Sequence, residues 1–170
     1  MTVESELQRL ALERAEAYET AISALDLGDP ARVYRQIRAY LAELEDHGRI
    51  KRFRENMLPL RAAQDGVQEL RCVPIELTSG SRFEFTIKMR QQQGICRLIE
   101  FEFHLNLPPA RNVDMVRIHL IPERPRDPLQ VPQCHMHIGG GERAHVPFPI
   151  MSPRLILHLV CEVIEPDIGV

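Results

Sequence analysis

The hydrophobic and polar positions of the chain follow a helical period at its beginning. In residues 4–25, and again after Pro30, apolar residues recur at steps of three and four, which is typical of amphipathic helices. Asp29 is placed to cap the second helix, and Gly48 is placed to end it. The apolar stripe of the second helix consists of Val33, Ile37, Tyr40, Leu41 and Leu44. We therefore expect residues 1–56 to form a helical hairpin that packs on the rest of the protein.

From about residue 68 the period changes to two, as in β-strands that bury one face. The segments in which apolar and polar residues alternate are residues 82–90, 98–107, 116–120 and 134–138. Gln91–Gly94 predicts a turn between the first two segments. Consecutive strands with one apolar and one polar face favour an antiparallel meander. We expect four or five such strands in a unit of residues 68–170.

The end of the chain returns to a helical period. Ser152 is a capping residue, Pro153 suits a first helical turn, and Pro166 predicts the end of the helix. The apolar stripe of this helix consists of Leu155, Ile156, Leu159, Val160, Val163 and Ile164. The expected fold class is therefore α+β, with a helical hairpin, an antiparallel meander and a C-terminal helix packed on the apolar face of the sheet.

Composition narrows the classes of protein that fit this fold. The 170 residues are 44% hydrophobic, which is enough for the core of one globular domain. A formal net charge of −3 argues against a protein that coats polyanions in general, so any contact with RNA must be local. The four cysteines form no Cys-x-x-Cys pair and read as reduced core thiols. The chain begins without a signal-peptide pattern and has no apolar run of roughly 20 residues, so we expect a cytoplasmic protein that makes no membrane contact.

Two histidines, His135 and His137, lie two residues apart in the alternating segment 134–138. Because alternate side chains of a strand share a face, both imidazoles should point to the same side. Cys134, Met136 and Ile138 should then point toward the helices. The same parity predicts that this polar face also carries Glu100, Glu102, His104, Arg117 and His119. We expect an open polar sheet surface on which histidines from neighbouring strands lie close together.

Three interpretations of this surface stay open. His135, His137 and either His119 or His145 could supply three ligands to zinc or a similar divalent ion, with an open position for water. Without a metal, two histidines could act as acid and base on a phosphodiester while Arg117 stabilises the developing negative charge. The third interpretation is a solvated polar face without chemistry, because a single His-x-His pattern is a weak motif. The candidate catalytic residues are therefore His135, His137, His119 and Arg117, and the candidate metal ligands are His135, His137, His119 and His145.

One family resemblance covers residues 98–166. The strand with Arg117, the proline-rich loop after it, the run from His135 to Gly139, Val146-Pro147 and the terminal apolar helix resemble the TumE-type toxin family of bacterial toxin–antitoxin pairs and related bacterial families. The resemblance implies a small toxin or defence protein that acts on RNA as a phosphodiesterase or ribonuclease, with His135 and His137 at the matching positions. A cognate antitoxin or other protein partner would then bind the N-terminal helices.

A second resemblance is to ubiquitin-conjugating-enzyme-like folds. These folds also combine an N-terminal helix, a four-strand meander, a segment with histidine near residues 135–137, and a helix that opens with Ser-Pro, here Ser152-Pro153. The nucleophilic cysteine expected soon after the histidine is absent, since Cys161 lies inside the closing helix. This resemblance implies a non-catalytic protein-interaction module.

Overall fold

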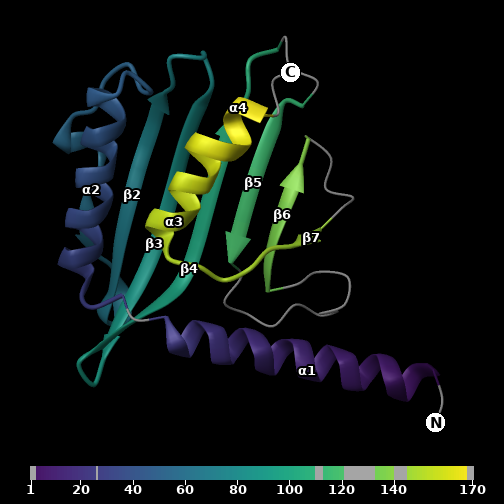
Figure 1. The fold of residues 1–170 in the computed structure, drawn as a ribbon. Helices are drawn as coiled ribbons and strands as arrows, with labels where there is room; N and C mark the ends of the chain where they lie inside the picture. Colours follow the sequence, from purple (N-terminus) through teal and green to yellow (C-terminus); the bar gives the residue numbers. More distant parts are fainter. Residues whose placement is uncertain (1–2, 26, 110–112, 121–132, 140–144, 168–170) are drawn as a thin grey trace.

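The computed structural model describes residues 3–25, 27–109, 113–120, 133–139 and 145–167. The strands are β1 (Leu60–Ala62), β2 (Val67–Glu76), β3 (Arg82–Gln92), β4 (Ile95–Asn106), β5 (Met115–Leu120), β6 (Cys134–Ile138) and β7 (Val146–Pro147). They form one antiparallel sheet in sequence order, with helices on one face (Figure 1). An α+β fold is therefore confirmed. Among the described residues, no helix is both long enough and apolar enough to cross a lipid bilayer.

The helices lie at the two ends of the chain. They are α1 (Val3–Ala24), α2 (Pro30–Asp46), the 3-10 turns Glu55–Met57 and Gln64–Gly66, α3 (Pro153–His158), the π-helical segment η3 (Leu159–Ile164) and α4 (Glu165–Asp167). The Asp29 carboxylate accepts a hydrogen bond from the Arg32 amide at 2.7 Å, as expected for an N-cap. Gly48 has a φ of 67° just after α2, and its amide donates to the Glu45 carbonyl oxygen. The predicted start and end of the second helix are thus confirmed.

The predicted helical hairpin is not observed. Figure 1 shows α1 extending across one end of the sheet, away from α2. The whole apolar stripe of α2 is buried in the core of the domain, so α2 has no second apolar face to offer α1. Leu10 and Leu12 of α1 are exposed as a result. The neighbour of α2 is α3, where the Arg154 guanidinium lies 5.5 Å from the centre of the Tyr40 ring.

The sheet confirms the alternating strands and adds three more. The predicted turn shortens to Gln93 and Gly94, both with positive φ, in a two-residue hairpin loop between β3 and β4. Strand β2 contains Pro74 and a register shift between Cys72 and Ile75, which interrupts its alternation. Strands β1 and β7 have three and two residues, too few to show a period. The expectation of four or five strands was therefore too low.

The core lies between the sheet and the helices that cover it. Its centre is Phe103, whose ring stacks on Phe83 at 5.9 Å and on Phe85 and Phe101 at 6.4 Å each between ring centres. All three of Val116, Ile118 and Leu120 on β5 are buried on the same side. All four cysteines lie among the described residues, are buried and form no disulfide bond. The apolar parity of β3 to β5 is thus confirmed, and it leaves their polar side chains on the face without helices.

Two predictions about burial at the end of the chain are wrong. The closing helix starts at Ser152 as expected, but Leu155 and Val163 are 49% and 45% exposed, and Leu157 and Cys161 are buried instead. Most of the helix circumference is apolar, so the sequence pattern alone does not define which side is buried. Ile138 is 50% exposed because it ends β6 to one side of the sheet area that α3 and α4 cover (Figure 1).

Candidate metal centre on the polar sheet face

The strand register aligns polar side chains into two rows across the face without helices. Residues directly opposite each other in antiparallel strands point to the same side, so each row follows from the pairing. The first row runs from β2 to β6 and consists of Arg71, Thr86, Glu102, His119 and His135. The second row runs from β3 to β6 and consists of Glu84, His104, Arg117 and His137. The predicted shared face of these side chains is confirmed, and the register places both rows side by side.

Three histidines meet where the two rows end. His119, His135 and His137 each offer a ring nitrogen, and these nitrogens lie within 4.8 Å of one another. His145, in the segment before β7, adds a fourth ring, with its centre 4.8 Å from that of His135 and 4.5 Å from that of His137. We call these four residues the histidine cluster. The structure thus brings together all four candidate metal ligands.

Two members of the histidine cluster, His135 and His137, are buried, whereas an open surface was expected. His135 is 1% exposed and His137 is 4% exposed, and the ring of His145 packs against both. An open face follows from the sheet alone, whereas His145, in the segment before β7, lies against the rings of His135 and His137. Burial is the main cause that lowers the pKa of His119 to about 4, and the positive charges that His104, His135, His137 and Arg117 can carry contribute to the same shift. His119 is therefore neutral at pH 7, and a neutral imidazole is the form that binds a metal ion.

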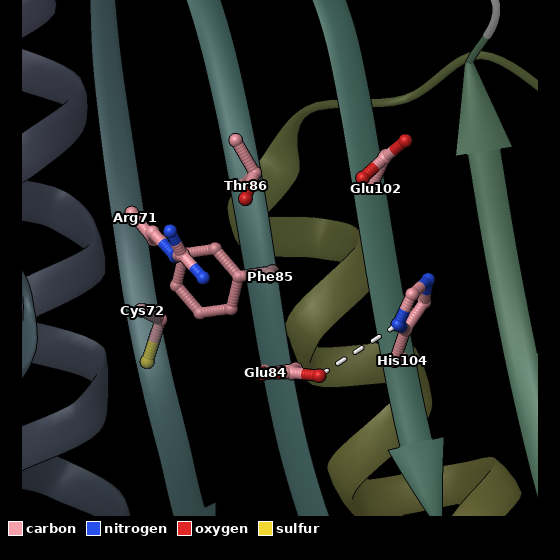
Figure 2. Close-up of a pocket in the computed structure, with 7 residues that line it drawn as sticks. All are labelled: Arg71, Cys72, Glu84, Phe85, Thr86, Glu102 and His104. Carbon is pink, nitrogen blue, oxygen red and sulfur yellow. Dashed lines mark ion pairs between the residues drawn. The ribbon is translucent and has the colours of Figure 1, made fainter.

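His104 lies next to the cluster on β4. Its Nε2 is 3.2 Å from Nε2 of His119, within hydrogen-bond distance. On the other side, its Nδ1 is 3.8 Å from Oε1 of Glu84 on β3 (Figure 2). His104 thus connects a carboxylate to the cluster.

A hollow of about 160 Å³ opens beside the cluster, over β2, β3 and β4. Its lining residues are Arg71, Cys72, Glu84, Phe85, Thr86, Glu102 and His104 (Figure 2). Arg71, Glu84 and Thr86 were not predicted as site residues. The alternation of residues 82–90 placed Glu84 and Thr86 on the polar face, but only the register shows that they lie beside Glu102 and His104. The hollow supplies room for a polar molecule one strand away from the histidines.

The cluster suits a borderline divalent ion. Imidazole nitrogens are good ligands for zinc, copper, iron and nickel, and three of them with a free fourth position form the usual catalytic zinc site. His119, His135 and His137 fit as the three ligands, and His145 is close enough to be a fourth or to border the open position. Arg117, directly opposite His137, brings a cation to the same place.

The side chains of the histidine cluster and of its neighbour Arg117 are the basis for an assignment of function. They come from adjacent strands and from one returning segment, and their positions follow from backbone pairing. The resemblances to TumE-type toxins and to ubiquitin-conjugating-enzyme-like folds stay predictions. No protein-family model, curated protein or solved structure matches this chain.

Proposed function

We propose that this protein is a small metal-dependent phosphodiesterase that cleaves RNA, with zinc or a similar divalent ion bound by His119, His135 and His137. The observation that carries the proposal is the convergence of three ring nitrogens within 4.8 Å at a buried position. Imidazole nitrogens are common ligands of zinc and similar divalent ions, and three of them are enough for a metal site with one open position.

The chemistry follows from the neighbours of the three ligands. A divalent ion held by His119, His135 and His137 would supply Lewis-acid activation of water for attack on phosphorus. The Arg117 guanidinium, which is positively charged at any physiological pH, would stabilise the negative charge that develops on the phosphoryl oxygens. The hollow beside the cluster would hold the part of the substrate next to the cleaved bond.

For His119, a role as a metal ligand is better supported than a role as the general acid of metal-free catalysis. A metal-free mechanism needs one histidine protonated as the general acid. With a pKa near 4, His119 does not carry that proton at pH 7. The same neutral state is the one required for a metal ligand, so the low pKa of His119 fits that role.

In a cell, we propose a cytoplasmic toxin or defence protein, in keeping with the resemblance of residues 98–166 to TumE-type toxins. A cognate antitoxin would cover α1, on which Leu10 and Leu12 are exposed. The same exposed leucines favour a second candidate, a non-catalytic protein-interaction module. In that case the histidine cluster would have a structural role only. Measurements of metal content and of RNA cleavage distinguish the two candidate functions.

The decisive experiment is the metal content of tag-free protein. We expect close to one divalent ion per chain in the wild type and loss of that ion in the His135→Ala/His137→Ala variant. The control is His47→Ala/His158→Ala, which removes two exposed histidines outside the cluster and should keep the metal. Because the cluster is buried, the single variant His135→Gln is added, and folding is checked by circular dichroism.

RNA cleavage completes the test. We expect metal-loaded wild type to cleave single-stranded RNA and the metal-free His135→Gln variant not to. A wild-type protein that takes up no zinc, manganese or iron after incubation would overturn the metal site. Metal-loaded protein without activity on RNA would overturn the enzymatic assignment.

A further inference from the structure

We propose that Glu84 and His104 are positioning residues that fix the tautomer of His119, with hydrogen on Nε2 and a lone pair on Nδ1. This inference rests on the proposed function only in its consequence, which is that His119 binds the metal through Nδ1. Glu84 and His104 touch neither the ion nor a reacting atom. They act through His119, from the strands on its other side (Figure 2).

The argument begins with the contact between the two imidazoles. The Nε2 atoms of His104 and His119 are 3.2 Å apart, and the two ring centres are 5.4 Å apart. A hydrogen bond between two nitrogens needs a hydrogen on one and a lone pair on the other. One of the two rings therefore donates from Nε2, and the other accepts at Nε2.

Only one direction of this hydrogen bond leaves His119 able to bind a metal. If His104 donates, neutral His119 accepts at Nε2 and carries its own hydrogen on Nδ1, so neither nitrogen has a lone pair to spare. If His119 donates from Nε2, its Nδ1 keeps a lone pair. The tautomer of His104 then decides whether the cluster can hold an ion.

The surroundings of His104 favour the second direction. A neutral His104 that accepts at Nε2 has its hydrogen on Nδ1, and Nδ1 lies 3.8 Å from the Glu84 carboxylate. The negative charge of Glu84 attracts that N–H, whereas a lone pair at the same place would be repelled. Glu84, His104 and His119 thus form a chain whose hydrogens all point from the cluster toward the carboxylate.

The direct test reads the hydrogen positions. Long-range proton–nitrogen NMR spectra of protein labelled with ¹⁵N-histidine distinguish a ring nitrogen with hydrogen, with a lone pair or with a bound metal. We expect Nε2–H on His119 in the metal-free protein, and metal on Nδ1 with Nε2–H retained after addition of zinc. A hydrogen on Nδ1 of His119 in the metal-free protein, or zinc on Nε2, would overturn the inference.

Variants test the consequence for metal binding. His104→Phe keeps a ring but cannot accept a hydrogen bond, and loss of such an outer partner lowers metal affinity by about 10- to 100-fold. Glu84→Gln should weaken zinc binding by less, because His104 remains. The matched control is Glu100→Gln on the same face, where Glu100 pairs with Lys88 at 2.8 Å and not with a histidine. His104→Gln should recover part of the affinity, since an amide oxygen can accept from Nε2 of His119.

The outcomes separate the two proposals. Wild-type zinc affinity in folded His104→Phe would overturn the positioning role and leave the metal site intact. A wild-type protein that binds no zinc would overturn the proposed function, while the tautomer of His119 in the metal-free protein would still decide the present inference. If Glu84→Gln and Glu100→Gln weakened zinc binding equally, only the overall charge of the face would matter. That result would also overturn the positioning role of Glu84 and His104.

Discussion

Arg117 lies directly opposite His137 in the pair of β5 and β6, so a permanent positive charge borders the histidine cluster. Its Nε is buried and has no hydrogen-bond partner among the described residues. A buried guanidinium nitrogen without a partner costs free energy. An anion bound at the cluster would supply that partner.

The first prediction concerns this arginine. Arg117→Met should keep the metal but lower RNA cleavage by about 10²- to 10³-fold, the usual loss when one group that stabilises transition-state charge is removed. Steady-state cleavage rates and metal content on the same preparations measure both effects. Arg97→Met, at an exposed position of β4, should leave the rate unchanged. A fall in rate that follows a loss of metal would instead assign Arg117 a structural role.

The second prediction concerns the fourth ring of the cluster. His145→Ala should keep one zinc ion per chain, because His119, His135 and His137 already provide three nitrogens. The visible absorption of cobalt-loaded His145→Ala should differ from that of cobalt-loaded wild type if His145 is a ligand. The two spectra should be the same if His145 only borders the ion. Complete loss of zinc in a folded His145→Ala protein would contradict a three-histidine site.

The third prediction is a dependence of stability on pH. The pKa of His119 is about 4 in the folded protein and about 6.5 when unfolded, so the unfolded chain takes up the proton first. The neutral residue stabilises the fold fully above about pH 6.5, and this contribution is lost as the pH falls toward 4. We expect metal-free protein to lose about 1–2 kcal/mol of unfolding free energy in this window, after allowing for partial solvent screening. Urea denaturation should show a smaller loss for His119→Gln, and an equal loss would contradict the prediction.

The fourth prediction tests the core beneath the site. Phe103→Ala should lower the unfolding free energy by about 3–5 kcal/mol, because Phe103 is fully buried and stacks on three other phenylalanines. Ile95→Ala, at a position near the β3–β4 turn that is about half exposed, should cost no more than about 0.5 kcal/mol. Denaturant unfolding measures both, and similar losses for the two variants would mean that the core is elsewhere.

The fifth prediction tests α1. Removal of residues 1–20 should leave the melting temperature and the metal content nearly unchanged, because Leu10 and Leu12 are exposed while Ile22 and Leu25 pack against the core and are retained. Calorimetry and metal analysis of the shortened protein provide the check. A large drop in melting temperature would show that α1 contacts the domain more extensively than this structure does.

The sequence correctly predicts those helices and strands that bury one face and expose the other. The stripe of α2 and the alternation in β3, β4 and β5 each bury one face and expose the other, so period and burial agree. In the closing helix nearly all positions are apolar, and the period therefore does not identify Leu157 and Cys161 as buried. The short strands β1 and β7 depend on pairing with a neighbour, which a local pattern does not contain.

The candidate site, like the fold, could be predicted from the sequence only in part. Parity alone places His119, His135 and His137 on one face, because side-chain direction alternates with residue number. The distances between them depend on the register of β5 and β6, which is a tertiary property. The burial of His135 and His137 depends on a segment that returns from outside the sheet with His145. Neither the short distances between the histidine rings nor the burial of His135 and His137 can be predicted from the local spacing of residues in the sequence.

The sequential order of the strands has a consequence for how the protein folds during its synthesis on the ribosome. Each strand pairs with the one before it, so the sheet can grow as the chain emerges, beginning with the β2, β3 and β4 hairpins. The histidines of the cluster belong to β5, β6 and the segment before β7, which are synthesised after β2, β3 and β4. A nascent chain would therefore hold no complete cluster until the segment before β7 has left the exit tunnel. Under the proposed function, a nascent chain that still lacks these strands would hold no complete site with which to cleave the messenger that encodes it.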